Sequence, residues 1–101
     1  TTLAADLEAA PWPFDPESFD AVVVTNYLHR PQFGDIVACL RPRGVLIYET
    51  FMAGNERYGK PSTPAFLLQP GELIATFGRN LNVVGFEQGG LGQPPRAMVQ
   101  R

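Results

Sequence analysis

The stretch spanning residues 19–31 constrains the fold of this chain more than any other part of the sequence. Its apolar run, residues 21–24, is followed directly by polar side chains: Thr25, Asn26, Tyr27, His29 and Arg30. Pro31 then opens a predicted helix, because proline is favoured in the first helical turn. In open α/β sheets, ligands bind at the carboxyl ends of the strands. This stretch therefore predicts both the fold class and the place of a site.

The rest of the chain alternates strand and helix patterns. The predicted elements are the tail of a strand at 3–7, strands at 19–26 and 45–50, helices at 31–40 and 71–77, and final strands at 81–87 and 96–101. Strand–helix–strand alternation favours a mostly parallel α/β sheet, and the last two strands, joined without a helix, favour an antiparallel edge pair. The continuous apolar run in 19–26 predicts burial on both faces. Trp12 and Phe14 are expected to anchor the proline-rich loop 8–18.

The composition excludes several classes of function. The 101 residues correspond to one small domain, and a net charge of −2 gives no general attraction to nucleic acid or anionic lipid. No apolar run approaches the ~20 residues of a membrane span, and no signal peptide is visible. The single cysteine, Cys39, predicts a buried small side chain in a reducing, cytoplasmic environment. One histidine and one cysteine provide no metal-ligand cluster.

Residues 53–69 have neither helical nor strand periodicity. A long irregular segment in a compact domain is usually functional or disordered. The apolar and aromatic residues at 66–68 favour an ordered lid, which excludes water from a site when it closes. Glu56 and Tyr58 are the candidate substrate contacts of this lid, and the alternative is a solvated loop.

Several segments together resemble the second half of a class I S-adenosylmethionine-dependent methyltransferase, and small bacterial members related to the tellurite-resistance type resemble this chain most. The segments that carry the resemblance are residues 5–8 (ADLE), 12–14 (WPF), 19–30 (FDAVVVTNYLHR), 40–44 (LRPRG) and 47–51 (IYETF). The resemblance implies a partial Rossmann-like sheet, mostly parallel with a C-terminal antiparallel strand pair. It also implies S-adenosyl-L-methionine as the cofactor and a small molecule as the methyl acceptor.

The glycine-rich turn that holds the methionine end of the cofactor in this family has no counterpart in the sequence. The glycines at 89, 90 and 92 follow a late predicted strand and precede no helix. We therefore expect residues 1–101 to form a single partial methyltransferase-like domain, the carboxyl-terminal portion of a larger protein, and to be inactive alone. A short independent protein is the alternative.

The resemblance also assigns roles to residues near the cofactor. Asp6 matches the carboxylate that accepts a hydrogen bond from the adenine amino group, and Leu7 matches the residue whose backbone N–H meets a ring nitrogen. The alternative is that Asp6 caps a turn. Asn26 and Tyr27 are expected to line the cofactor pocket.

Four further residues are candidates for catalysis or substrate binding. His29 is the candidate general base, because imidazole titrates near neutral pH, and the alternative is a structural histidine at a strand end. Arg30 would bind an anionic substrate group, or is solvated. Glu49 and Thr50 end the next predicted strand, so both are expected to face the same crevice. Glu49 would hold a substrate cation or orient His29, or is an ordinary strand-end carboxylate.

The family's strand order would pair residues 19–26 with a first strand that is missing here. An open strand edge is a template for another chain, so we expect a homodimer through this edge. The competing hypothesis is a non-catalytic interaction or scaffolding module derived from a methyltransferase. A response-regulator-like or nucleotide-binding domain is disfavoured, because the chain lacks clustered acidic strand ends and a phosphate-binding loop.

Overall fold

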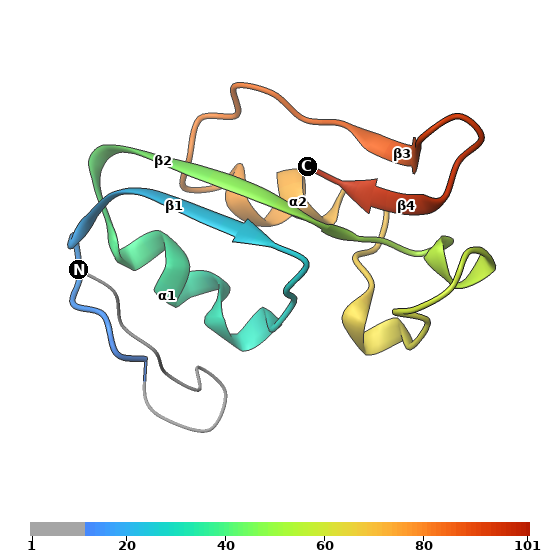
Figure 1. The fold of residues 1–101 in the computed structure, drawn as a ribbon. Coiled ribbons are helices and arrows are strands. Elements are labelled where there is room, and N and C mark those ends of the chain that lie inside the picture. Colours follow the sequence, from blue (N-terminus) through green and yellow to red (C-terminus); the bar gives the residue numbers. More distant parts are fainter. Residues whose placement is uncertain (1–11) are drawn as a thin grey trace.

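The computed structural model describes residues 12–101, which form a four-stranded sheet with helices packed against it (Figure 1). The elements are β1 (Phe19–Thr25), η1 (Arg30–Gln32), α1 (Phe33–Ala38), β2 (Leu40–Phe51), η2 (Asn55–Arg57), η3 (Pro64–Phe66), α2 (Glu72–Phe77), β3 (Gln88–Leu91) and β4 (Ala97–Gln100). The α/β class is as predicted. No helix within residues 12–101 has the length and apolar character needed to cross a membrane.

The sheet is mixed, which corrects the prediction of a mostly parallel sheet. Its strand order is β1-β2-β4-β3. β1 and β2 are parallel, whereas β4 is antiparallel to both β2 and β3. The reason is the connection after α2, which reaches β4 through a hairpin with β3 rather than through a crossover helix. An antiparallel strand pair at the C-terminus is confirmed, but its first strand is β3 (Gln88–Leu91) and not the predicted 81–87.

Within residues 12–101 only one face of the β1–β2 pair is covered, so the prediction that β1 is buried on both faces is wrong. Val22 and Val24 pack against the core, but Val23 points to the other face and is 63% exposed. Val45 and Ile47 of β2 are paired with Ala21 and Val23 and are also more than half exposed. We call Val23, Val45 and Ile47 the open face. The strands alternate in burial although their sequence does not alternate in polarity.

The core lies between the covered face and the two helices. Its buried members are Leu28, Phe33, Ile36, Tyr48, Met52, Leu68, Leu73 and Phe77. Three of their aromatic rings meet, with centroids 5.1 Å apart for Phe33–Phe77 and 5.7 Å apart for Tyr48–Phe77. Trp12 packs against this core edge-to-face with Phe14, so the loop is anchored as expected. Cys39 is buried, also as expected.

The predicted strand at 81–87 is wrong, and β3 begins at Gln88 instead. β4 is only four residues long, and its ladder with β3 uses it completely. Glu87 and Arg101 extend that ladder with two backbone hydrogen bonds, of 2.7 and 3.0 Å. The apolar residues before Glu87 therefore have no strand to pair with, and Val84 is fully exposed. The predicted helix at 31–40 is present as η1 followed directly by α1.

The segment 53–69 is ordered, as expected, but it is held in place at several points. Leu68 is completely buried and forms an isolated parallel bridge with Met52. The buried Asn55 carboxamide donates to the Pro61 carbonyl at 3.0 Å and accepts from the Met98 N–H at 3.1 Å. These contacts join the segment to both β2 and β4.

The structure predicts a large loss of stability for one apolar truncation and almost none for another. Leu68→Ala should lower the free energy of unfolding by about 2–5 kcal/mol, because it leaves a cavity in the core. Val84→Ala should change it by less than about 0.5 kcal/mol, because the side chain is already in water. Urea denaturation followed by circular dichroism measures both values. A large loss from Val84→Ala would indicate that residues 81–87 form a buried strand after all.

Candidate functional site

A crevice of about 260 Å³ lies at the carboxyl ends of β1 and β2. Its lining comes from three places in the chain: the residues after β1, the end of β2, and the segment 53–69. The lining residues are Asn26, Tyr27, Leu28, Thr50, Phe51, Pro61 and Phe66. We call it the strand-end crevice. It lies where the sequence predicts a site, since parallel strands end at the same edge of a sheet.

The backbone of Asn26 turns the chain away from the sheet at the mouth of this crevice. Its φ of +54° is in the left-handed region, which asparagine enters more readily than most residues. Its N–H donates to the Glu49 carbonyl at 2.9 Å, the last bond of the parallel ladder. The exposed carboxamide is thereby left at the strand end, beside the buried Thr50.

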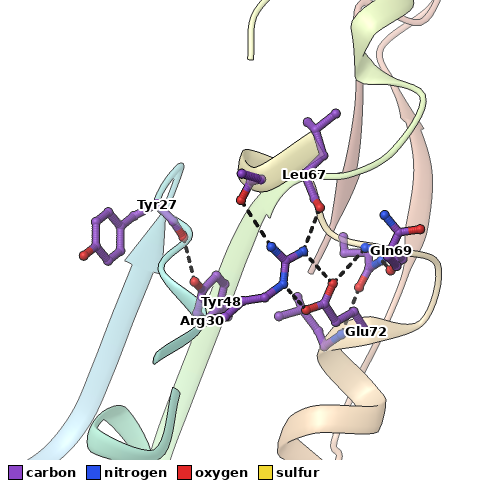
Figure 2. A network of polar contacts seen from close by, with 9 residues as sticks. Tyr27, Arg30, Tyr48, Leu67, Gln69 and Glu72 are labelled. Atoms are coloured by element: carbon purple, nitrogen blue, oxygen red, sulfur yellow. Dashed lines mark hydrogen bonds and ion pairs between the residues drawn. The ribbon is translucent and has the colours of Figure 1, made fainter. Parts of the chain in front are cut away.

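Tyr27 is held by hydrogen bonds at both its side chain and its backbone. Its hydroxyl donates to the buried Gln32 carboxamide at 2.8 Å. Its carbonyl accepts from the Tyr48 hydroxyl at 2.6 Å, as Figure 2 shows. Burial raises the pKa of Tyr48 to about 12, so this phenol stays protonated and remains a donor at physiological pH. The Tyr27 wall of the crevice is therefore fixed before any ligand binds.

Arg30 joins the end of β1 to η3 and α2, as Figure 2 shows. Its guanidinium donates to both carboxylate oxygens of Glu72, at 2.6 and 2.9 Å, and to the carbonyls of Leu67 and Ala65, at 2.8 and 3.2 Å. Glu72 also accepts from the Gln69 N–H at 2.9 Å. The two charged groups stabilise each other, so the pKa of Glu72 is lowered and that of Arg30 is raised. Arg30, a predicted substrate contact, is engaged within the chain.

The other predicted site residues lie outside the lining of the crevice. Glu49 forms an ion pair with Arg101, 3.0 Å between Nη1 and Oε2. His29 precedes η1, where its carbonyl accepts the Gln32 N–H at 3.0 Å. Glu56 accepts the N–H of Gly54 at 2.8 Å, and Tyr58 is exposed at the end of η2.

The remaining two, Asp6 and Leu7, fall outside the described residues. Of the predicted site residues, the structure thus brings together Asn26, Tyr27 and Thr50 at one crevice.

Sequence reasoning missed the apolar part of the lining. Leu28, Phe51, Pro61 and Phe66 contribute to the crevice but carry no group that marks them as functional. The available signal was the aromatic and proline content of the segment 53–69 beside a predicted site. Phe66, which is 54% exposed, is the clearest case.

The lining determines which ligand chemistry fits. It offers a carboxamide and hydroxyl groups together with the rings of Tyr27, Phe51 and Phe66, but no charged side chain. Aromatic faces attract an organic cation such as a sulfonium or an alkylammonium. The volume is below the ~300–1,000 Å³ of sites for whole drug-sized ligands. A crevice of this volume holds at most part of a drug-sized ligand. Within residues 12–101, no three potential metal ligands lie together.

Comparisons with known proteins add no family assignment. No family model matches the chain, and neither the curated proteins nor the solved structures compared with it include a similar protein. A proposal about function therefore rests on the fold, on this crevice and on the sequence resemblance of residues 19–30 and 47–51.

The backbone at Asn26 predicts how the crevice can be altered without damage to the fold. Asn26→Gly should lower the free energy of unfolding by less than about 1 kcal/mol, because glycine accepts a positive φ. Asn26→Val should lower it by about 1–2 kcal/mol or more, because a branched side chain is strained there. Thermal and urea unfolding of both variants measures the difference. Equal losses would contradict the left-handed conformation.

The Arg30–Glu72 pair predicts a pH dependence of stability. A carboxyl group whose pKa is lowered in the folded state stabilises the fold above its ordinary pKa and loses this contribution as the pH falls. The free energy of unfolding of wild type should exceed that of Glu72→Gln by about 1 kcal/mol at neutral pH, after allowance for solvent screening. The gap should shrink below about pH 4. Urea titrations at several pH values measure it.

The matched control for this prediction is Arg30→Met. In this background Glu72→Gln should have little further effect at neutral pH, because the cation that lowers the pKa of Glu72 is gone. A gap between wild type and Glu72→Gln that stays constant from neutral to acidic pH would contradict the role of the ion pair.

Proposed function

We propose that this chain is a portion of an S-adenosylmethionine-dependent methyltransferase and contributes the substrate side of its site. The observation that carries the proposal is the strand-end crevice. It gathers Asn26, Tyr27 and Thr50 at the carboxyl ends of a parallel strand pair, which is where α/β enzymes bind ligands. The aromatic lining suits the sulfonium cation of such a cofactor. The resemblance of residues 19–30 and 47–51 to this family supplies the reaction class.

In this proposal the residues of the chain act mainly by alignment. The cofactor supplies an electrophilic methyl group on a sulfonium sulfur, and the transfer is an in-line displacement that depends on positioning. The Asn26 carboxamide and Tyr27 would contact the cofactor, the Thr50 hydroxyl would orient the methyl acceptor, and Phe66 would exclude water from the crevice. His29 stays the candidate base. His29 is not part of the lining, so no residue of the lining is assigned as a base.

A non-catalytic module is the second candidate function. It is favoured by the small volume of the crevice and by the absence of charged side chains from its lining. In that case the crevice would bind a partner side chain or a small cation, and no methyl group would be transferred.

The proposal is tested by titrating the ¹⁵N-labelled chain with S-adenosylhomocysteine and, separately, with S-adenosylmethionine. We expect weak, saturable shifts of the backbone amides of residues 26–28 and 50–51, larger for the charged sulfonium. Asn26→Gly should reduce these shifts, because it removes a carboxamide and keeps the backbone. Val84→Ala is the control, because the Val84 side chain is fully exposed and is not part of the lining, and it should bind like wild type.

Other results of this titration would argue against a methyltransferase site. If choline, a simple organic cation, gives the same shifts as both cofactor forms, the crevice recognises cations generally and the module is favoured. If no amide near the crevice moves at saturating ligand, the proposal that it contributes to a methyltransferase site is wrong. The isolated chain should show no methyl transfer, and rapid turnover would contradict the expectation that the glycine-rich turn is required.

A further inference from the structure

Phe66 is an exposed aromatic residue on a backbone that is held in place. Its side chain is 54% exposed and lines the strand-end crevice from the end of η3. The side chain of the next residue, Leu67, is buried, so the chain enters the core directly after the Phe66 ring. Single exposed apolar side chains are common on protein surfaces. Phe66 differs from them because one guanidinium binds the carbonyls on both sides of it.

Arg30 makes these two contacts from the turn that follows β1. Its Nη1 donates to the Ala65 carbonyl at 3.2 Å, and its Nη2 donates to the Leu67 carbonyl at 2.8 Å (Figure 2). The backbone before and after Phe66 is therefore fixed relative to the end of β1. The direction in which the Phe66 side chain leaves the backbone is fixed with it. Arg30 itself is not part of the lining of the crevice.

Glu72 holds the guanidinium in turn. Its two carboxylate oxygens accept from Arg30 at 2.6 and 2.9 Å, and one of them also accepts the Gln69 N–H at 2.9 Å. The Glu72 side chain is only 18% exposed, so the pair is partly shielded from solvent and is expected to be stronger than a fully exposed one. A planar guanidinium can bind a carboxylate and neighbouring carbonyls at the same time, a geometry that the compact charge of a lysine does not match.

We propose that Arg30 is a positioning residue of the strand-end crevice and acts on the ligand through Phe66. The Arg30–Glu72 pair holds the Phe66 ring at the crevice before a ligand binds, so the ligand meets a preformed aromatic wall. Binding is tighter when a wall of the site does not have to be ordered by the ligand. The proposal rests on the strand-end crevice as the ligand site of the proposed function, but it does not depend on methyl transfer.

The first test needs no ligand and measures amide hydrogen exchange in the ¹⁵N-labelled chain. The N–H groups of Phe66 and Leu67 both donate to carbonyls at the start of the same turn. In Arg30→Met these two amides should exchange about fivefold faster or more, and the amides of the β1–β2 ladder should change less. Arg41→Met is the matched control. It removes an ion pair with Asp20 at the opposite end of the same two strands and should leave the two amides unchanged.

The second test is a double-mutant cycle of affinity, with S-adenosylmethionine as the probe. Arg30→Met should weaken binding about threefold or more when Phe66 is present. In the Phe66→Ala background, Arg30→Met should have little further effect, because the ring on which Arg30 acts is gone. Arg30→Lys keeps the charge and should restore part of the affinity. Arg41→Met should bind like wild type.

Two results would overturn the proposal. One is equal exchange of the Phe66 and Leu67 amides in wild type and Arg30→Met. The other is an equal loss of affinity from Arg30→Met with and without the Phe66 ring, which a merely structural role of Arg30 would give. If Arg30→Met does not fold, Arg30→Lys replaces it and should speed exchange of the same two amides by a smaller factor. If wild type binds no S-adenosylmethionine, the proposed function fails, and the exchange measurement alone supports or overturns the role of Arg30.

Discussion

The bidentate ion pair between Arg30 and Glu72 holds the separate parts of this structure in one arrangement. Arg30 follows β1, and Glu72 begins α2, 42 residues later. The same guanidinium binds the carbonyls of Ala65 and Leu67, which flank Phe66. Since Phe66 forms one wall of the strand-end crevice, Arg30 positions that wall without contacting the crevice itself. A predicted substrate contact therefore acts in this structure as a positioning residue.

Two buried amides complete the arrangement and explain why the segment 53–69 is well packed without regular structure. Asn55 joins it to β4, and the completely buried Gln100 joins β4 to α2. Gln100 accepts the N–H of Leu73 at 3.1 Å, so a strand residue satisfies one of the amides left unpaired at the start of a helix. α2 has no side-chain cap of its own, and this contact takes that role.

The parts of the fold that depend on local pattern could be predicted from the sequence. The apolar run 21–24, the proline at 31 and the polar strand ends located β1, the following helix and the crevice at Asn26, Tyr27 and Thr50. Long-range pairing could not be predicted. The sequence around Val84 has strand character but no partner, because β4 is short and already paired. In the same way, nothing local to Arg30 indicates a carboxylate 42 residues away.

The sheet is covered on one face only within residues 12–101. Parallel strands are normally covered on both faces, yet Val23, Val45 and Ile47 are exposed here, and among residues 12–101 β1 pairs only with β2. Tyr27 lines both the strand-end crevice and an apolar groove beside residues 21–25 of β1, and its hydroxyl is held by Gln32. A group bound in the groove and a ligand bound in the crevice would both contact Tyr27. If either occupant shifts Tyr27, the affinities of the two must change by the same factor, because coupling between binding sites is reciprocal.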